Sequence, residues 1–262
     1  MTTPTVGHLF QEGRLAEAVE AAGEAVKAAP RDAAPRILLA ELLLYAGNLE
    51  RADAVLDATA AVDPGTGLVV AEFRQLLRAA TARRQVLHEG RVPEFLGEPT
   101  RTQRHALEAL TALRAGDALA AAIAAEAAEV ARPAVAGHTP DAAFTDYRDA
   151  DDLWAGTFEV LTTNGKYFWI PTERVVSLEF HPPKRPRDLL WRRCTMVVRD
   201  GPDGDVYVPA LYGDGPAADD GVRLGRRTEW TETAPIQGTG QRMFLIGDEG
   251  VAIQQLTTME FA

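Results

Sequence analysis

The chain of 262 residues contains a single cysteine, Cys194. One thiol cannot form an intrachain disulfide, and it cannot supply a four-cysteine zinc site. Together with His181 and Asp188 it provides the residue types of a thiol triad. Its place in an alternating strand pattern favours a small buried core residue instead. The cysteine content therefore fits a protein of a reducing compartment.

Positive charge is also scarce, with 27 Lys and Arg against 38 Asp and Glu and a net charge of −11. Neither half of the chain is basic: residues 1–139 hold 14 basic and 18 acidic residues, and residues 140–262 hold 13 and 20. Binding to a nucleic-acid backbone depends on an excess of Lys and Arg. The charge balance thus excludes a protein that binds DNA or RNA non-specifically.

Long apolar runs are missing as well. The N-terminal residues MTTPTVGHLF have neither a basic segment nor an apolar stretch of signal-peptide length. The Ala-rich run 116–131 is short and is interrupted by Asp117, Glu126 and Glu129. We therefore expect no membrane partner and a cytoplasmic location.

Reaction motifs are absent from the sequence. It contains no GxSxG, phosphate-binding loop, HExxH or dinucleotide fingerprint, and its five histidines show no ligand spacing. We expect no catalytic residue, no cofactor and no metal site of a known motif.

A helical hairpin is present at residues 35–64, where the sequence reads PRILLAELLLYAGNLERADAVLDATAAVDP. Apolar residues recur at helical spacing on both sides of Gly47, which can adopt a left-handed backbone and end a helix. Pro64 cannot continue the second helix. This pattern predicts two antiparallel helices.

The same punctuation recurs along the first half of the chain. Gly13 precedes Pro30 by 17 positions, as Gly47 precedes Pro64 and Gly116 precedes Pro133. The first two frames are 34 residues apart, which is the period of the tetratricopeptide repeat. Small residues, namely Ala18, Ala52 and Ala121, follow each glycine by five positions, where paired helices approach closely. The spacing favours an α-solenoid over an ordinary helical bundle.

Composition changes near residue 135, since all four tryptophans follow residue 150. Residues 157–163 and 166–170 flank Asn164-Gly165, the strongest short hairpin signal. Further strands are expected at 174–180, 189–199, 205–211, 243–246 and 251–255. The sequence therefore predicts an α+β protein with two parts: a TPR-like helical domain at residues 1–135, and a β-rich, barrel-like domain at residues 140–262.

The helical part offers a surface for a partner. The first helix of each tetratricopeptide hairpin lines the concave face. In the second hairpin the groove positions are Ala34, Ile37, Glu41, Leu44 and Tyr45, and we expect the last four to contact a partner. An apolar groove with one carboxylate suits an amphipathic helix or an extended peptide. Two alternatives stay open: Leu44 and Tyr45 pack on neighbouring repeats, or residues 91–102 fold across the groove.

A second group of charged residues lies in the β-rich part. Asp146, Asp149, Asp151 and Asp152 are close in sequence, but their spacing does not match a calcium loop. The stretch 184–193 (KRPRDLLWRR) is basic and could pair with these carboxylates or face a partner. As a second partner surface we consider a set of eight residues: Asp149, Asp151, Asp152, Arg187, Asp188, Trp191, Arg192 and Arg226.

Seven blocks, taken together, resemble the ImpE/TagJ family of type VI secretion accessory proteins: ELLLYAGNLERAD, FRQLLRA, FTDYRDADDLW, GKYFWIP, PPKRPRDLLWRR, VPALY and LGRRTEW. They occur in order over nearly the whole chain. One departure is Glu229, where the family pattern leads us to expect Asp before Trp230. The resemblance implies helical repeats, a β-rich domain and a cytoplasmic accessory role. It further implies partners, a small sheath subunit and the AAA+ ATPase that recycles contracted sheath.

The leading hypothesis is therefore a non-enzymatic adaptor that binds a helix or peptide of a sheath component in its helical groove. Two alternatives remain: a metal-dependent enzyme that uses Asp149, Asp151 and Asp152, and a purely structural module of a larger assembly.

Overall fold

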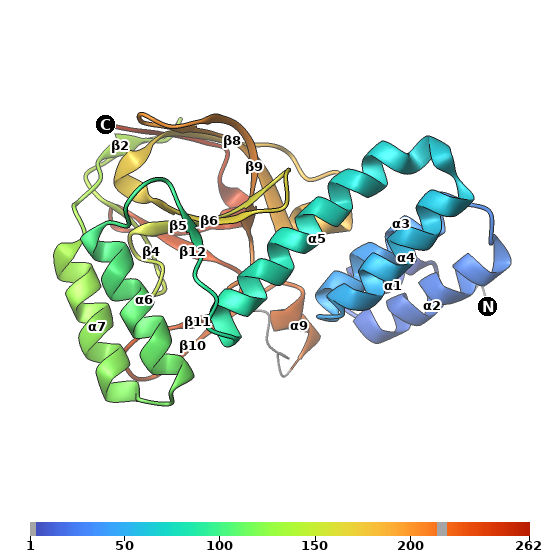
Figure 1. The fold of residues 1–262 in the computed structure, drawn as a ribbon, viewed down its shortest axis with the longest axis horizontal. Coiled ribbons are helices and arrows are strands. Elements are labelled where there is room, and N and C mark those ends of the chain that lie inside the picture. Colours follow the sequence, from blue (N-terminus) through green and yellow to red (C-terminus); the bar gives the residue numbers. More distant parts are fainter. Residues whose placement is uncertain (1–3, 214–218) are drawn as a thin grey trace.

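A computed structural model describes residues 4–213 and 219–262 of the chain. The N-terminal part is a stack of helices, which lies on the right in Figure 1. Two helical hairpins, α1 with α2 and α3 with α4, lead into the long helix α5, which runs from this stack to the sheet. The bounds are α1 Val6–Gln11, α2 Leu15–Ala28, α3 Ala33–Tyr45, α4 Leu49–Val62 and α5 Gly67–His88, with a short 3-10 turn at Pro64–Thr66.

The predicted glycine breaks are present in the hairpins. Gly13, Gly47 and Gly116 have φ values of 82°, 70° and 74°, the left-handed region in which glycine has no steric penalty. The next helix begins at once, because Asn48 and Asp117 accept hydrogen bonds from backbone N–H groups in its first turn. The Gly–Asn and Gly–Asp pairs thus end one helix and cap the next.

The small residues predicted at the helix contacts are fully buried. Ala18, Ala52 and Ala121 each have 0% relative exposure. A larger side chain at any of these positions would push the paired helices apart, since interiors are close-packed. The alanine five positions after each glycine therefore marks a real contact between helices.

The third Gly–Pro frame forms a hairpin that does not extend the stack. Its helices, α6 Arg101–Arg114 and α7 Ala118–Ala131, lie at the opposite side of the molecule from α1–α4 (Figure 1). The side chain of Gln103 on α6 donates a hydrogen bond to the carbonyl oxygen of Trp169 in the sheet. The repeat pattern therefore continues in sequence but is interrupted in space.

The connection between α5 and α6 joins the sheet. Its strand β1, Glu94–Phe95, pairs in parallel with β6. Thus residues 91–102 do not cover the concave face of α3. Helix α7 ends at Ala131 and strand β2 begins at Gly137, but the sheet also takes in the earlier segment 94–95.

The β-rich part is built on an open sheet of nine strands in the order β1-β6-β5-β9-β8-β7-β14-β2-β3. The two-part α+β prediction is confirmed, although the sheet does not close into a barrel. Asn164-Gly165 connects β5 and β6 as predicted. The strands are β2 Gly137–His138, β3 Ala143–Phe144, β5 Thr157–Thr162, β6 Tyr167–Pro171, β7 Val175–Phe180, β8 Trp191–Val198, β9 Asp203–Pro209 and β14 Thr258–Phe261.

Two smaller sheets complete this part. One pairs β10 Thr228–Trp230 with β11 Gly238–Gly240, and the other has the order β13-β12-β4. In the latter, β4 is Tyr147–Asp149, β12 is Met243–Ile246 and β13 is Glu249–Ala252. Short helices α8 Pro186–Leu190 and α9 Asp220–Arg223, with 3-10 turns at Thr172–Arg174 and Ile253–Gln255, fill the connections.

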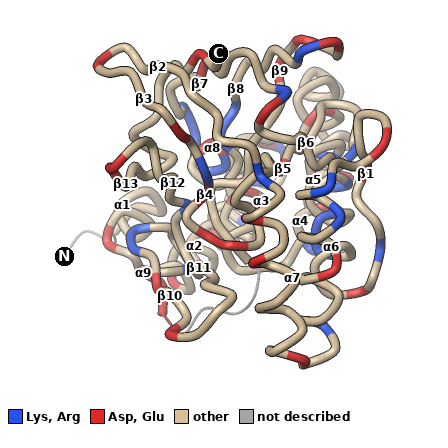
Figure 2. Tube along the Cα trace, turned by 90° about the vertical axis from the view of Figure 1, so that its left-hand side faces the viewer, with Lys and Arg blue, Asp and Glu red and all other residues tan. Residues whose placement is uncertain are grey.

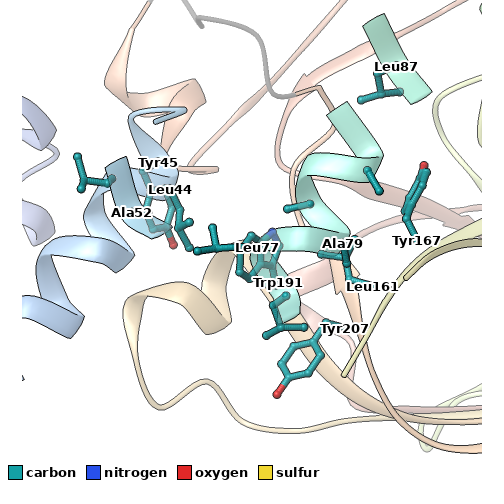
Figure 3. Packing of buried hydrophobic residues seen from close by; sticks show 14 of the residues in the cluster. Leu44, Tyr45, Ala52, Leu77, Ala79, Leu87, Leu161, Tyr167, Trp191 and Tyr207 are labelled. Atoms are coloured by element: carbon teal, nitrogen blue, oxygen red, sulfur yellow. The ribbon is translucent and has the colours of Figure 1, made fainter. Parts of the chain in front are cut away.

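One hydrophobic core joins the helices to the sheet. It includes Leu44 and Tyr45 of α3, Leu77 of α5, and Trp191 and Tyr207 of the sheet. Figure 3 shows these side chains meeting where α3, α5 and the start of β8 converge. A second core lies within the β-rich part, around Tyr147, Phe158 and Phe244. Among the described residues, no helix has the length and apolar character needed to cross a membrane.

Candidate functional site

Helix α8 covers the C-terminal half of α3. The hydroxyl of Tyr45 donates a 2.6 Å hydrogen bond to the carbonyl oxygen of Pro186, the first residue of α8. Glu41, Leu44 and Tyr45 are each at most 5% exposed, whereas Ile37 is half-buried. Glu41, Leu44 and Tyr45 therefore do not line an open groove, because helix α8 of the same chain covers this part of α3.

Arg187 is the central contact of α8 on the helical repeats. Its guanidinium lies 4.6 Å from the centre of the Phe73 ring, and its Nε is 3.8 Å from Oε1 of Glu41. Both members of this ion pair are buried. Oε1 of Glu41 and Nε and Nη1 of Arg187 nevertheless have no hydrogen-bond partner in the described residues. The pair is therefore buried without the direct hydrogen bonds that usually offset desolvation.

Because the Glu41 carboxyl is buried in this contact, its charge depends on pH near neutrality. Burial raises its pKa to about 7, against the opposing influence of the positive charges of Arg187 and Arg185. A carboxyl with such a pKa changes its charge near neutral pH. The contact between α3 and α8 thus contains a titratable group in the physiological range.

A cavity lies beside this contact, and we call it the junction cavity. Its volume is about 300 Å³, and it is bounded by α3 and its turn, by α5, and by the segments around Trp191 and α9. Apolar side chains and three arginines contribute to its walls: Leu44, Tyr45, Leu49, Ala80, Leu190, Trp191, Leu211, Val222, Arg83, Arg84 and Arg223. The cavity is at the lower end of the size range of small-molecule and side-chain pockets.

Helix α9 lies on the other side of the junction cavity. A carboxylate oxygen of Asp220 accepts a hydrogen bond from the backbone N–H of Leu15, at the start of α2. Nη2 of Arg226 donates to the carbonyl oxygens of Phe10 and Gln11, at the end of α1. Arg226, predicted as part of a partner surface, therefore ties the β-rich part to the first repeat.

The acidic cluster binds internal donors. Asp149 accepts from the hydroxyl of Tyr212 and the N–H of Asp151, and Asp151 accepts from the N–H groups of Leu153 and Gly238. Burial raises the pKa of Asp149 to about 6 and, together with the charge of Asp149, that of Asp151 to about 7. These carboxylates shape the loop and hold β11.

Asp152 has a similar role. It pairs with Arg148 at 2.8 Å and accepts a 2.7 Å hydrogen bond from the N–H of Ile236. Across residues 4–213 and 219–262, no group of three or more His, Cys, Asp and Glu side chains is placed to hold a metal ion. The arrangement gives no support to the metal-dependent enzyme.

The basic stretch 184–193 does not pair with the acidic cluster. Arg192 donates to the backbone carbonyls of Ile253 and Leu256, and Arg193 pairs with Asp205. Asp188 accepts from the backbone N–H groups of Lys184 and Arg185, so it caps α8.

The prediction of a second exposed surface is therefore wrong for most of its members. Five of the eight residues are buried, with at most 7% exposure: Asp149, Asp151, Arg187, Trp191 and Arg192.

A buried charge network missed by the sequence analysis lies behind the junction cavity. Glu159 of β5 is 0% exposed and pairs with Arg83 of α5 at 2.6 Å and with Arg242. Arg242 also pairs with Asp149 at 3.1 Å and lies over the Tyr212 ring. Burial alone would raise the pKa of Glu159, but the charges of Arg83 and Arg242 outweigh it and lower the pKa to about 2.

The network fixes α5 to the sheet. Arg83 additionally donates to the carbonyl oxygen of Tyr212, and Tyr167 donates to Glu159. One sequence signal pointed to it: Glu159 is the only charged residue of the strand TFEVLT and lies between apolar neighbours. Its partners are 76 and 83 positions away, so sequence spacing alone could not identify them.

Comparisons with known proteins agree with this architecture. The family model described as ImpE protein matches residues 141–260, and a tetratricopeptide repeat model matches residues 9–83. The crystal structure of a protein from Vibrio parahaemolyticus is similar to this structure with a TM-score of 0.92. That protein is 27% identical in sequence, and the match covers 98% of this chain and 97% of that chain.

A curated relative is similar over nearly the full length. The type VI secretion system accessory component TagJ of Pseudomonas aeruginosa strain PAO1 is 32% identical over 255 residues, which is 97% of this chain and 89% of the relative. Identity at this level over both chains, with the ImpE match in the β-rich part, identifies the family. The chain belongs to the ImpE/TagJ family of type VI secretion accessory proteins.

Proposed function

We propose that this chain is a non-enzymatic adaptor of the type VI secretion machine that acts in the cytoplasm. It binds a helix or peptide of a sheath component, for which the small sheath subunit is the first candidate. A second contact, with the AAA+ ATPase that recycles contracted sheath, would make it a link between the two. The proposal is supported by the relative's role as an accessory component and by repeats of a protein-binding type.

The observation that carries the proposal is the junction cavity. It adjoins the α3 positions predicted to contact a partner, and Leu44 and Tyr45 form part of its wall. Ile37 lies two turns earlier on α3 and is half-buried. An apolar anchor of the partner would enter the cavity, while its chain runs along α3 past Ile37. Glu41 would hold α8 at the edge of this site through Arg187.

Blocking the cavity is expected to abolish partner binding without unfolding the protein. Ala46 lines the cavity, is exposed, and ends α3 with φ −78° and ψ 1°. An Ala46→Trp variant places an indole at the mouth of the cavity. In calorimetric titrations with the small sheath subunit of the same secretion system, it should bind at least about tenfold more weakly, a loss of about 1.4 kcal/mol or more.

Ala115 provides a matched control. It ends α6 with nearly the same backbone angles, φ −78° and ψ −6°, is also exposed, and lies away from the cavity. Ala115→Trp should bind like the parent protein. Equal binding by both variants would remove the cavity from the proposal, and no binding by the parent protein would reject this subunit as the partner. A parallel titration with the AAA+ ATPase tests the second contact.

A further inference from the structure

Helix α7 has an exposed apolar surface on the side opposite its buried face. Ala121, Ala125 and Ala128 pack inward, and the residues on the outer side follow at intervals of four, three and four positions. Positions with this spacing lie along one face of a helix. The outer residues, which we call the α7 stripe, are Leu119, Ile123, Glu126 and Val130.

The exposure of the stripe is large for branched aliphatic side chains. Leu119 is 73% exposed, Ile123 60% and Val130 82%. In Figure 1, α7 lies at the edge of the molecule beyond α6, and no further helix of the described residues stacks on it. A helix that is apolar on both faces is normally covered on both faces, and the last helix of a repeat stack normally has a polar outer side. The α7 stripe therefore has the character of an interface.

The charges on α7 indicate what covers it. The helix has no Lys or Arg, and its charged residues are Glu126 and Glu129 (Figure 2). Glu129 is bound to Arg132 and Arg148, whereas Glu126 is exposed and makes no ion pair within the described part of the chain. An apolar stripe with one free carboxylate complements an amphipathic helix that carries Lys or Arg beside its apolar face.

A second copy of the chain is a poorer occupant. Two α7 helices packed antiparallel would bring Glu126 of each copy near the other's apolar stripe and leave both carboxylates without a cation. We propose that the α7 stripe binds an amphipathic helix of another protein through apolar contacts and a cation facing Glu126.

This inference is independent of the junction cavity, because no residue of α7 lines that cavity. It can be tested with two labelled model peptides, each about five helical turns long, that share one leucine stripe. Lysines flank the stripe in one peptide and glutamates in the other. Fluorescence anisotropy with the full chain should show binding of the lysine peptide and much weaker binding of the glutamate peptide.

Variants of exposed residues distinguish specific binding to the α7 stripe from non-specific hydrophobic binding. Ile123→Asp should weaken binding of the lysine peptide at least about tenfold. Leu68→Asp changes an isolated residue of similar exposure, 83%, on α5 and should have no effect. Glu126→Lys should reverse the charge preference by roughly two- to fivefold, as expected for an exposed ion pair. Thermal melts of all three variants should match that of the parent protein.

Three results would overturn the proposal. The first is no binding of the lysine peptide by the parent protein, and the second is equal loss in Leu68→Asp and Ile123→Asp. The third is a dimer of the parent protein in sedimentation equilibrium that Ile123→Asp dissociates, because a second copy would then cover the stripe.

Discussion

Replacing Glu159 by glutamine is expected to destabilise the protein by about 3–5 kcal/mol, the usual cost of breaking a buried ion pair by removal of one partner. The change keeps the shape of the side chain but leaves Arg83 and Arg242 facing a neutral amide. Both guanidinium groups are buried, so neither can turn to water. Urea unfolding at pH 7, followed by circular dichroism, measures the difference.

Glu50 gives the matched control. It pairs with Arg84 at the contact of α4 and α5, but its side chain is 70% exposed. Glu50→Gln should therefore cost no more than about 1 kcal/mol. If Glu159→Gln is as mild as Glu50→Gln, the buried network does not hold α5 to the sheet.

The network also predicts an acid dependence. The folded-state pKa of Glu159, about 2, lies below its ordinary value of 4.5. A lowered pKa stabilises the fold above the ordinary value, and this stabilisation is lost as the pH falls from about 4.5 through about 2. The Glu159→Gln variant should lack this part of the acid transition.

The Glu41→Gln substitution is expected to reveal a pH dependence of the opposite sign, in which the parent protein loses stability as the pH rises. Burial raises the folded-state pKa of Glu41 from 4.5 to about 7. A raised pKa favours the fold at low pH, and that contribution is lost as the pH rises through about 7. Between pH 4.5 and 8 the parent protein should lose about 3 kcal/mol of stability relative to Glu41→Gln, with the two similar at the acid end.

Unfolding curves of both proteins at several pH values test this. If the unfolding free energies of the parent protein and of Glu41→Gln changed in parallel with pH, the carboxyl would not titrate in the contact between α3 and α8.

Local patterns in the sequence predicted most of the elements. The glycine breaks, the buried alanines and the Asn164-Gly165 hairpin each depend on residues close in the chain, and each is present. The two-part fold followed from these patterns. What local patterns could not show is that the third hairpin separates from the stack, because that depends on how α6 packs on the sheet.

The site residues were harder to predict for the same physical reason. Helical spacing placed Leu44 and Tyr45 on one face of α3, but it could not show that α8, about 140 positions later, covers that face; Tyr45 and Pro186 are 141 residues apart. Likewise, four aspartates within the seven residues 146–152 suggested a surface. Their donors, Arg242 and the N–H of Gly238, come from the far end of the chain.

We propose that a partner binds where the helical repeats meet the sheet. Hydrogen–deuterium exchange of the full chain, with and without the small sheath subunit, tests it most directly. We predict slower exchange in residues 33–46 of α3 and its turn and in residues 209–213, which border the junction cavity. Unchanged exchange in both segments, while the bound subunit slows exchange elsewhere, would place the binding site outside the junction cavity.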